Sequence, residues 1–165
     1  MFTLTAVKTT ITTLALSGSL FLTNAALAHD NSLHVTVQPN ADLKSGTIAL
    51  QKGDYKKAYS KLKRASRINL APAHKANAYN NLCVAEQNLG KFEDAISSCK
   101  AALKHDRQNW RANLNLGVIY IILEQPEKAM TYLSKAKKQQ ANVATINRLI
   151  AKASTAIEMK SFAAK

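Results

Sequence analysis

An internal repeat is the feature that most constrains how this chain folds. Three similar segments, GDYKKA at residues 53–58, GKFEDA at 90–95 and EQPEKA at 124–129, begin 37 and then 34 residues apart. Seven residues after the alanine that ends each segment stands another alanine, with a residue between them that faces the same way. The alanines are Ala58 and Ala65, Ala95 and Ala102, and Ala129 and Ala136, and the residues between them are Leu62, Cys99 and Leu133. Small residues at this spacing let two helices approach closely, so each segment predicts one helix of a packed pair.

A second pattern lies upstream of each segment. YNNLC at residues 79–83 matches NLNLG at 113–117 and, more loosely, DLKSG at 42–46. The last residue of each pattern is small, namely Cys83, Gly117 and Gly46. Each unit is therefore predicted to be a helix, a short turn and a second helix. The chain has only 5 Gly and 3 Pro, which disfavours an all-β sandwich or barrel because tight turns are few.

Each helix pair alone would leave an apolar face exposed, and stacking of the pairs buries it. The units are thus predicted to form an all-α solenoid whose ends need polar caps. Residues 142–159 are expected to supply one cap, a helix with Asn142 as its N-cap and with Arg148, Lys152 and Glu158 off its apolar stripe. The stripe consists of Val143, Ile146, Leu149, Ile150, Ala153 and Ile157.

Residues 39–143 resemble three tetratricopeptide repeats, at about 39–72, 76–109 and 110–143, within a helical domain of about 41–160. The first unit departs from the family pattern, because Ser45 stands in place of the usual Leu and Ala49 in place of the usual Tyr. The extra residues of the longer first interval are assigned to a stretched connection at 69–74. In the third unit Pro126 replaces the usual aromatic residue and begins the second helix.

The resemblance implies a binding module that holds a peptide or a partner helix in a concave groove lined by the first helices. Asparagine amides both donate and accept hydrogen bonds, which suits an extended ligand. The groove residues expected in the second and third units are Asn77, Asn80, Asn81, Val84, Gln87, Asn88, Arg111, Leu114, Val118 and Ile121. Leu43, Thr47, Leu50 and Gln51 of the first unit and Ile122 of the third are expected beside them.

Asn81 and Arg111 also match two positions of the carboxylate clamp with which some tetratricopeptide-repeat proteins grip a C-terminus. Three other clamp positions hold Leu43, Thr47 and Asn115, none of which is cationic. An Asn before the Leu also serves packing within the repeat, so the resemblance leaves both roles of Asn81 open.

Residues 1–28 are predicted to be a cleaved signal peptide. Lys8 precedes an uncharged, mostly apolar stretch over 11–22, and ALA at 26–28 has the small-x-small pattern that a signal peptidase recognises. The stretch is shorter than the ~20 residues that a spanning helix needs, which disfavours the alternative of a retained membrane anchor. We therefore expect a periplasmic or secreted protein without a stable membrane span, in which residues 29–40 form an extended lead-in.

The chain is strongly basic, with a formal net charge of +13. Six cations in the second helix of the first unit are predicted to share one half of its helical wheel. This basic stripe consists of Lys56, Lys57, Lys61, Lys63, Arg64 and Arg67. Its simpler interpretation is a solvated face, and the alternative is a surface for an anionic partner such as a membrane or lipopolysaccharide. No aromatic residues alternate with the cations at the surface, which disfavours nucleic acid as the partner.

Cys83 and Cys99 are expected at inward-facing positions on the two helices of the middle unit. In an oxidising compartment a disulfide between them would close a 16-residue interval and contribute ~3 kcal/mol. The alternative is two buried thiols, because antiparallel helices only sometimes bring Cα atoms within the ~7 Å that a disulfide requires.

We predict no catalytic residue, metal site or cofactor. The pairs His29-Asp30 and His105-Asp106 are sequence neighbours, and neighbouring side chains on a helix point about 100° apart. The sequence contains neither a Gly-rich phosphate loop nor a nucleophile elbow. It therefore favours a non-enzymatic protein whose partner is another protein or peptide.

Overall fold

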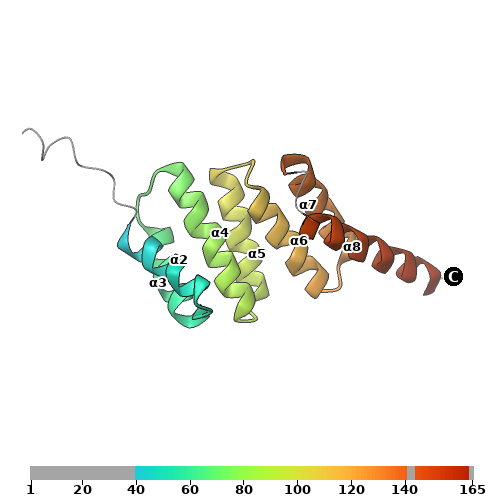
Figure 1. Ribbon diagram of the computed structural model, residues 1–165, viewed down its shortest axis with the longest axis horizontal. Helices are drawn as coiled ribbons and strands as arrows, with labels where there is room; N and C mark the ends of the chain where they lie inside the picture. The colour runs from blue at the N-terminus through green and yellow to red at the C-terminus, as the bar shows by residue number, and fades with distance from the viewer. Residues whose placement is uncertain (1–39, 141–143, 164–165) are drawn as a thin grey trace, which may run out of the picture. The chain divides into compact units, whose positions relative to one another are not determined.

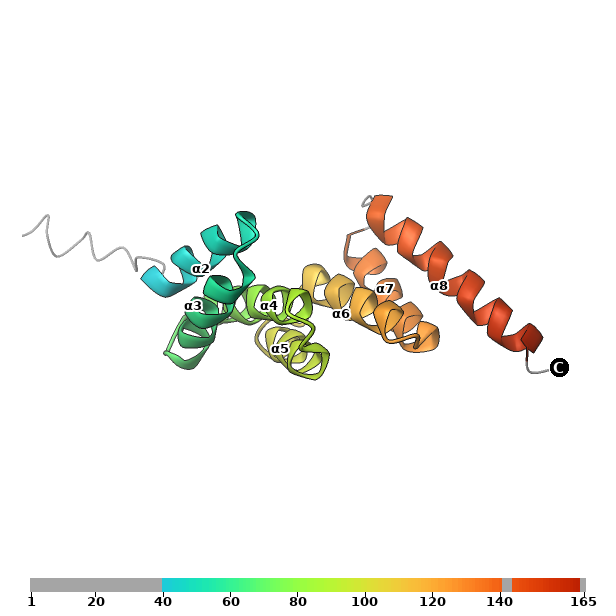
Figure 2. The same cartoon turned by 90° about the horizontal axis from the view of Figure 1, so that it is seen from below.

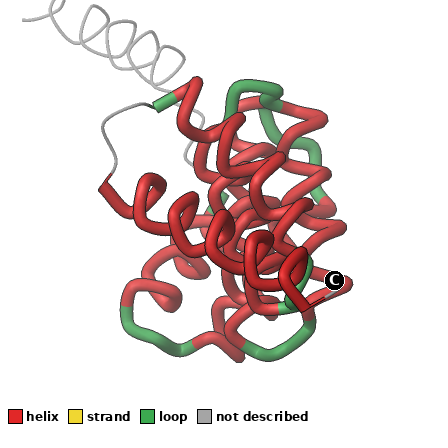
Figure 3. The backbone as a smooth tube through the Cα atoms, turned by 90° about the vertical axis from the view of Figure 1, so that its right-hand side faces the viewer, coloured by secondary structure: helices red, strands yellow, loops and turns green. Residues whose placement is uncertain are grey.

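The computed structural model describes residues 40–140 and 144–163, which belong to one compact unit that extends from Pro39 to Lys165. This part of the chain is helical and contains no strand (Figure 3). Its helices are α2 (Ala41–Gln51), α3 (Tyr55–Arg67), α4 (Pro72–Asn88), α5 (Phe92–His105), α6 (Trp110–Ile122), α7 (Pro126–Gln139) and α8 (Ala144–Ala163). The predicted signal peptide and the lead-in up to residue 39 lie outside the described residues. The all-α solenoid predicted for the rest is confirmed.

Local sequence signals explain where most helices begin. The side chain of Asn40 accepts hydrogen bonds from the backbone N–H groups of Asp42 and Leu43 at the start of α2. Asp54 and Asn109 cap α3 and α6 in the same way, which satisfies N–H groups that have no partner within the helix. Helices α4 and α7 begin instead with Pro72 and Pro126, where the missing N–H and fixed φ of proline suit the first turn.

Helices pack in pairs, α2 with α3, α4 with α5 and α6 with α7, and each second helix also packs against the first helix of the next pair (Figures 1 and 2). The first helices α2, α4 and α6 contact one another in turn. All of the alanines predicted to allow this close packing are fully buried, namely Ala58, Ala65, Ala95, Ala102, Ala129 and Ala136. The prediction that these small residues lie between packed helices is therefore confirmed.

One contact recurs in every unit between the small residue of the first helix and a residue of the second. A Cβ atom added at Gly46 would lie 2.6 Å from Cγ of Leu62, and one added at Gly117 would lie 2.6 Å from Cγ of Leu133. The leucine side chain thus occupies the space that the glycine leaves open. In the middle unit these two positions are Cys83 and Cys99, so a pair of cysteines stands where the other units pack Leu on Gly.

The expectation of a stretched connection at 69–74 is wrong. Helix α3 ends at Arg67 and α4 begins at Pro72, so the link is as short as the one between α5 and α6. The extra length lies in α4, which has 17 residues where α6 has 13. Pro72 can begin a helix without an N–H, and the alanines that follow favour the helical state, so the chain adds a turn to the helix.

The C-terminal helix packs against α7 and α6, with Ile146 and Ala153 buried as the apolar stripe predicts. It extends to Ala163, beyond the predicted end at residue 159, and its last turns expose Met159 (69% exposed) and Phe162 (84% exposed). The predicted N-cap Asn142 lies outside the described residues. No helix in residues 40–140 or 144–163 combines the length and apolarity needed to cross a membrane.

Candidate functional site

A groove of about 500 Å³ is lined by the first helices α2 and α4 and by one residue of α6, Arg111. Among the residues predicted for it, Asn77, Asn80, Asn81 and Arg111 do line it. Helix α2 contributes Leu43, Lys44, Thr47, Ile48 and Gln51, and the first turn of α4 contributes His74. The groove therefore combines side chains from positions far apart in the sequence, as expected for a surface built by stacked repeats.

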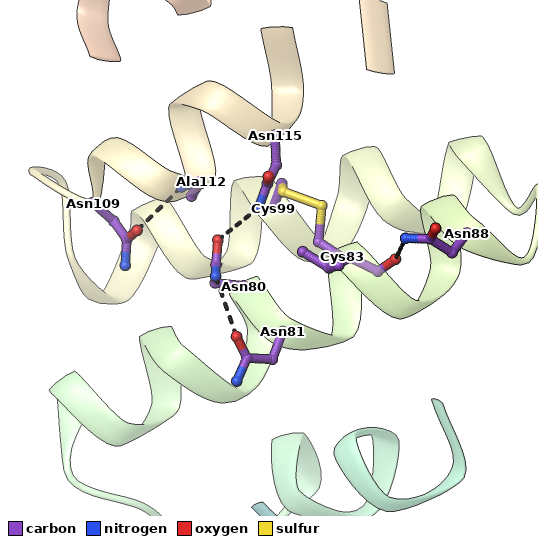
Figure 4. Close-up of a disulfide and its surroundings, with 9 residues drawn as sticks. Asn80, Asn81, Cys83, Asn88, Cys99, Asn109, Ala112 and Asn115 are labelled. Carbon is purple, nitrogen blue, oxygen red and sulfur yellow. Dashed lines mark hydrogen bonds between the residues drawn. A yellow bond between two sulfur atoms is a disulfide. The ribbon is translucent and has the colours of Figure 1, made fainter. Parts of the chain in front are cut away.

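A chain of amide hydrogen bonds crosses the floor of the groove from α6 to α2. Asn115 Nδ2 donates to Asn80 Oδ1 at 3.0 Å, and Asn80 Nδ2 donates to Asn81 Oδ1 at 3.3 Å (Figure 4). Asn81 Nδ2 donates to Thr47 Oγ1 at 3.0 Å, and Thr47 Oγ1 donates to the backbone carbonyl of Leu43 at 2.8 Å. This asparagine ladder links three helices from three units and makes Asn80 almost fully buried (6% exposed).

The ladder changes the role predicted for Asn80. The sequence placed its amide in the groove as a contact for an extended ligand, but the side chain is buried and bonded to Asn115 and Asn81. A buried amide needs such partners, because leaving it without them costs ~1–3 kcal/mol. Asn80 therefore holds neighbouring units in register, and Asn77, which is exposed, is better placed for a ligand.

Apart from Arg111, the third-unit residues predicted for the groove do not line it. Leu114 and Ile121 are half-buried and pack against the core shared by the second and third units. Ile121 also lines a separate cavity of about 260 Å³ with Ala153 and Met159 of α8. Val84, Gln87, Asn88 and Val118 do not line the 500 Å³ groove.

Three basic side chains line the groove, one from each first helix: Lys44, His74 and Arg111. Arg111 is exposed and its guanidinium lies 4.6 Å from the centroid of the Trp110 ring. No carboxylate is among the lining side chains within the described part of the chain. Lys44 and His74 were not predicted for the groove. The sequence did contain a signal for His74, because Pro72 and the alanines after it favour a helix that begins there and includes His74 in its first turn.

The basic stripe on α3 is less available than its sequence suggested. The carboxylate of Asp42 on α2 forms ion pairs with Lys61 at 3.2 Å and with Arg64 at 3.1 Å. Lys63 donates to the hydroxyl of Tyr59 at 2.6 Å and lies over its ring. The stripe members that remain exposed without such a contact in the described residues are Lys56, Lys57 and Arg67. A role for the stripe in binding anions stays a prediction.

The structure joins Cys83 of α4 to Cys99 of α5 by a disulfide, with their Cα atoms 5.3 Å apart (Figure 4). Both residues are fully buried, so the bond lies inside the helix pair. Helix α4 also carries Asn77, Asn80 and Asn81 of the groove. The bond therefore fixes a groove-lining helix to the helix behind it.

Glu86 is a buried carboxyl group in the same helix pair. It takes the position that Tyr120 holds in the third unit, is 5% exposed, and its Oε2 has no hydrogen-bond partner among the described residues. Burial raises the pKa of Glu86 above its usual value, and the hydrogen bond from Ser98 only partly opposes this. The folded state thus favours the neutral acid more than the unfolded chain does.

Glu86→Gln is expected to raise the melting temperature at pH 7. Because the folded state raises the pKa above the ordinary value of 4.5, the folded wild type binds a proton more tightly than the unfolded chain. Its stability therefore falls as the pH rises from about 4.5 through the folded pKa, and Gln removes this loss. Melting followed by circular dichroism should show an advantage for Glu86→Gln that shrinks toward pH 4.5. An equal advantage at all pH values would contradict the assignment, and exposed Glu127→Gln is the control.

Comparison with known proteins agrees with this architecture. Residues 88–153 match the sequence model of a family described as Tetratricopeptide repeat. A TPR repeat-containing thioredoxin, TTL4, from Arabidopsis thaliana is 26% identical over 117 residues, which cover 70% of this chain and 17% of the relative. The chain thus spans less than a fifth of that relative's length.

Solved structures share the fold. The Sgt2 TPR domain from Aspergillus fumigatus superposes with a TM-score of 0.70 at 20% identity, over 79% of this chain and 85% of that one. The first TPR of Spaghetti (RPAP3), bound to the HSP90 peptide SRMEEVD, gives 0.68 at 20% identity, over 74% and 95%. The TPR2B domain of yeast Sti1, in a complex with pHsp70, gives 0.64 at 22% identity, over 73% and 98%. Because the identities are this low, the structural similarity establishes the helical-repeat fold and nothing further.

Proposed function

Since this chain is a tetratricopeptide-repeat protein, we propose that it is a non-catalytic adaptor that holds a segment of another protein in the groove formed by α2, α4 and α6. The groove itself carries the proposal, because exposed polar and cationic side chains from three separate units line one continuous space of about 500 Å³. Two of its fold neighbours, RPAP3 and Sti1, are complexed with an HSP90 peptide and with pHsp70 respectively. Their example supports a protein or peptide as the occupant.

We also propose that the adaptor works in the periplasm or outside the cell. Two features support this location: the signal-peptide pattern of residues 1–28 and the disulfide between Cys83 and Cys99. Disulfides persist in oxidising compartments and are rare where cellular thiols stay reduced. N-terminal sequencing of the protein from fractionated source cells tests this. A start at His29 in the envelope or medium fraction supports export, and an intact N-terminus in the cytoplasmic fraction contradicts it.

The double variant Asn77→Glu/Arg111→Glu is expected to lose most of the partner that the wild-type protein captures. Both side chains are exposed in the groove, so the change alters the binding surface without disturbing the asparagine ladder. A photo-crosslinking residue at Asn77 of the otherwise wild-type protein, read by mass spectrometry of an envelope extract, identifies the bound protein. Quantitative pull-down of that protein from the same extract then measures the loss in the double variant.

Ser97→Glu/Lys100→Glu is the matched control for that experiment. It makes the same change in net charge on exposed positions of α5, outside the groove. Capture that survives in the groove variant, or falls equally in both variants, would rule out the groove as the binding surface.

A further inference from the structure

We propose that the groove recognises acidic side chains within an extended segment of its partner, and does not require a C-terminal carboxylate. This inference rests on the proposed adaptor function and gives the chemistry of its ligand. It follows from three properties of the groove: the sign of its charges, the hydrogen bonds already made on its floor, and the spacing of its helices.

The groove has basic side chains and no acidic one in the described part of the chain. Lys44, His74 and Arg111 line it from three helices, and no Asp or Glu side chain lines it within the described part of the chain. The carboxylate of Asp42, also on α2, is paired with Lys61 and Arg64 of α3. Helix α4 also begins at this groove without a side-chain cap, which adds partial positive charge at its first turn. An acidic segment therefore complements this surface.

A carboxylate at the end of a chain needs several donors aimed at one point. The groove floor offers fewer donors than its amides suggest, because one N–H of each amide is already bonded within the asparagine ladder. Asn81 Nδ2 donates to Thr47, Asn80 is buried between Asn115 and Asn81, and Asn115 Nδ2 donates to Asn80. Lys44, His74 and Arg111 lie instead on separate helices, so each is placed for a different acidic side chain.

The spacing of those helices sets the spacing of the acids. Packed helices lie ~8–10 Å apart, so the basic side chains on α2, α4 and α6 are separated by about that interval. An extended chain advances ~3.1–3.4 Å per residue, and three residues cover the same distance. In the polyproline II conformation every third side chain also points the same way. The groove thus fits acidic residues placed three apart.

The test uses a nine-residue peptide with Glu at every third position and Ala and Pro elsewhere, acetylated and amidated at its ends. A second peptide has Gln in place of Glu, and a third is the Gln peptide with a free C-terminal carboxylate. Each is titrated into the oxidised full chain by calorimetry and by the fluorescence of Trp110, the single Trp, which lies against Arg111. We expect the blocked Glu peptide to bind at least tenfold more tightly than either Gln peptide.

Matched variants locate the binding. Arg111→Gln and Lys44→Gln are each expected to weaken binding of the Glu peptide about tenfold. Lys56→Gln, at an exposed position of α3 outside the groove, should change it less than threefold. The inference is overturned if the Gln peptide with a free carboxylate binds as tightly as the blocked Glu peptide, if Lys56→Gln weakens binding as much as Arg111→Gln, or if none of the peptides binds. Each of these results leaves the adaptor function to be decided by crosslinking at Asn77.

Discussion

Replacing both cysteines with alanine is expected to lower the free energy of unfolding by about 4 kcal/mol. Loss of the disulfide over its 16-residue separation accounts for about 3 kcal/mol, and the rest comes from the space left by two fully buried sulfur atoms. A domain of this size has ~5–15 kcal/mol of stability in total, so the loss is a large fraction. Urea denaturation of the Cys83→Ala/Cys99→Ala variant and of the oxidised wild type measures it.

The variant Cys83→Gly/Cys99→Leu should recover about 2 kcal/mol of that loss. It gives the middle unit the Leu-on-Gly contact of the other units, in which Leu62 packs on Gly46 and Leu133 packs on Gly117. The remaining deficit includes the ~1 kcal/mol cost of a glycine inside a helix. If this variant proves no more stable than the alanine pair, the disulfide does not substitute for the Leu-on-Gly contact.

The same contact predicts the second large effect, in the third unit. Gly117→Val is expected to destabilise the domain by about 3 kcal/mol, because a Cβ at this position would lie 2.6 Å from Cγ and Cδ2 of Leu133. Leu133 is fully buried, so the added methyl groups would displace a packed core side chain. Helix propensity does not add to this cost, because valine is a slightly better helix former than glycine.

A double-mutant cycle tests whether the cost arises from the steric clash with Leu133. Leu133→Ala alone should cost about 3 kcal/mol as a core cavity, but the cost of Gly117→Val should largely disappear in the Leu133→Ala background. Ala151→Val at an exposed position of α8 is the control for a valine added to a helix where it meets no packed side chain. Additive losses from the two changes would show that Gly117 and Leu133 do not share one space.

The residues of the groove show which features the sequence predicts and which it does not. The pattern NNLC predicted that Asn80 and Asn81 lie on a first helix, and both line the groove. It did not reveal that Asn80 is buried, because its partner Asn115 is 35 residues away and meets it only when the units stack. Lys44 and His74 were not predicted for a related reason: each lines the groove only because the helix of another unit packs beside its own.

Taken by itself, the sequence determined the number of helix pairs, their order and the residues that pack between them, because the spacing of small and apolar side chains is a property of the chain read in one dimension. Only the tertiary structure decided which side chains stay available. Asp42 binds Lys61 and Arg64 of the basic stripe, and Asn81 bonds to Thr47, which is 34 residues away. Hydrogen bonds and ion pairs act over a few ångströms, so their partners are fixed by how the helices stack in space.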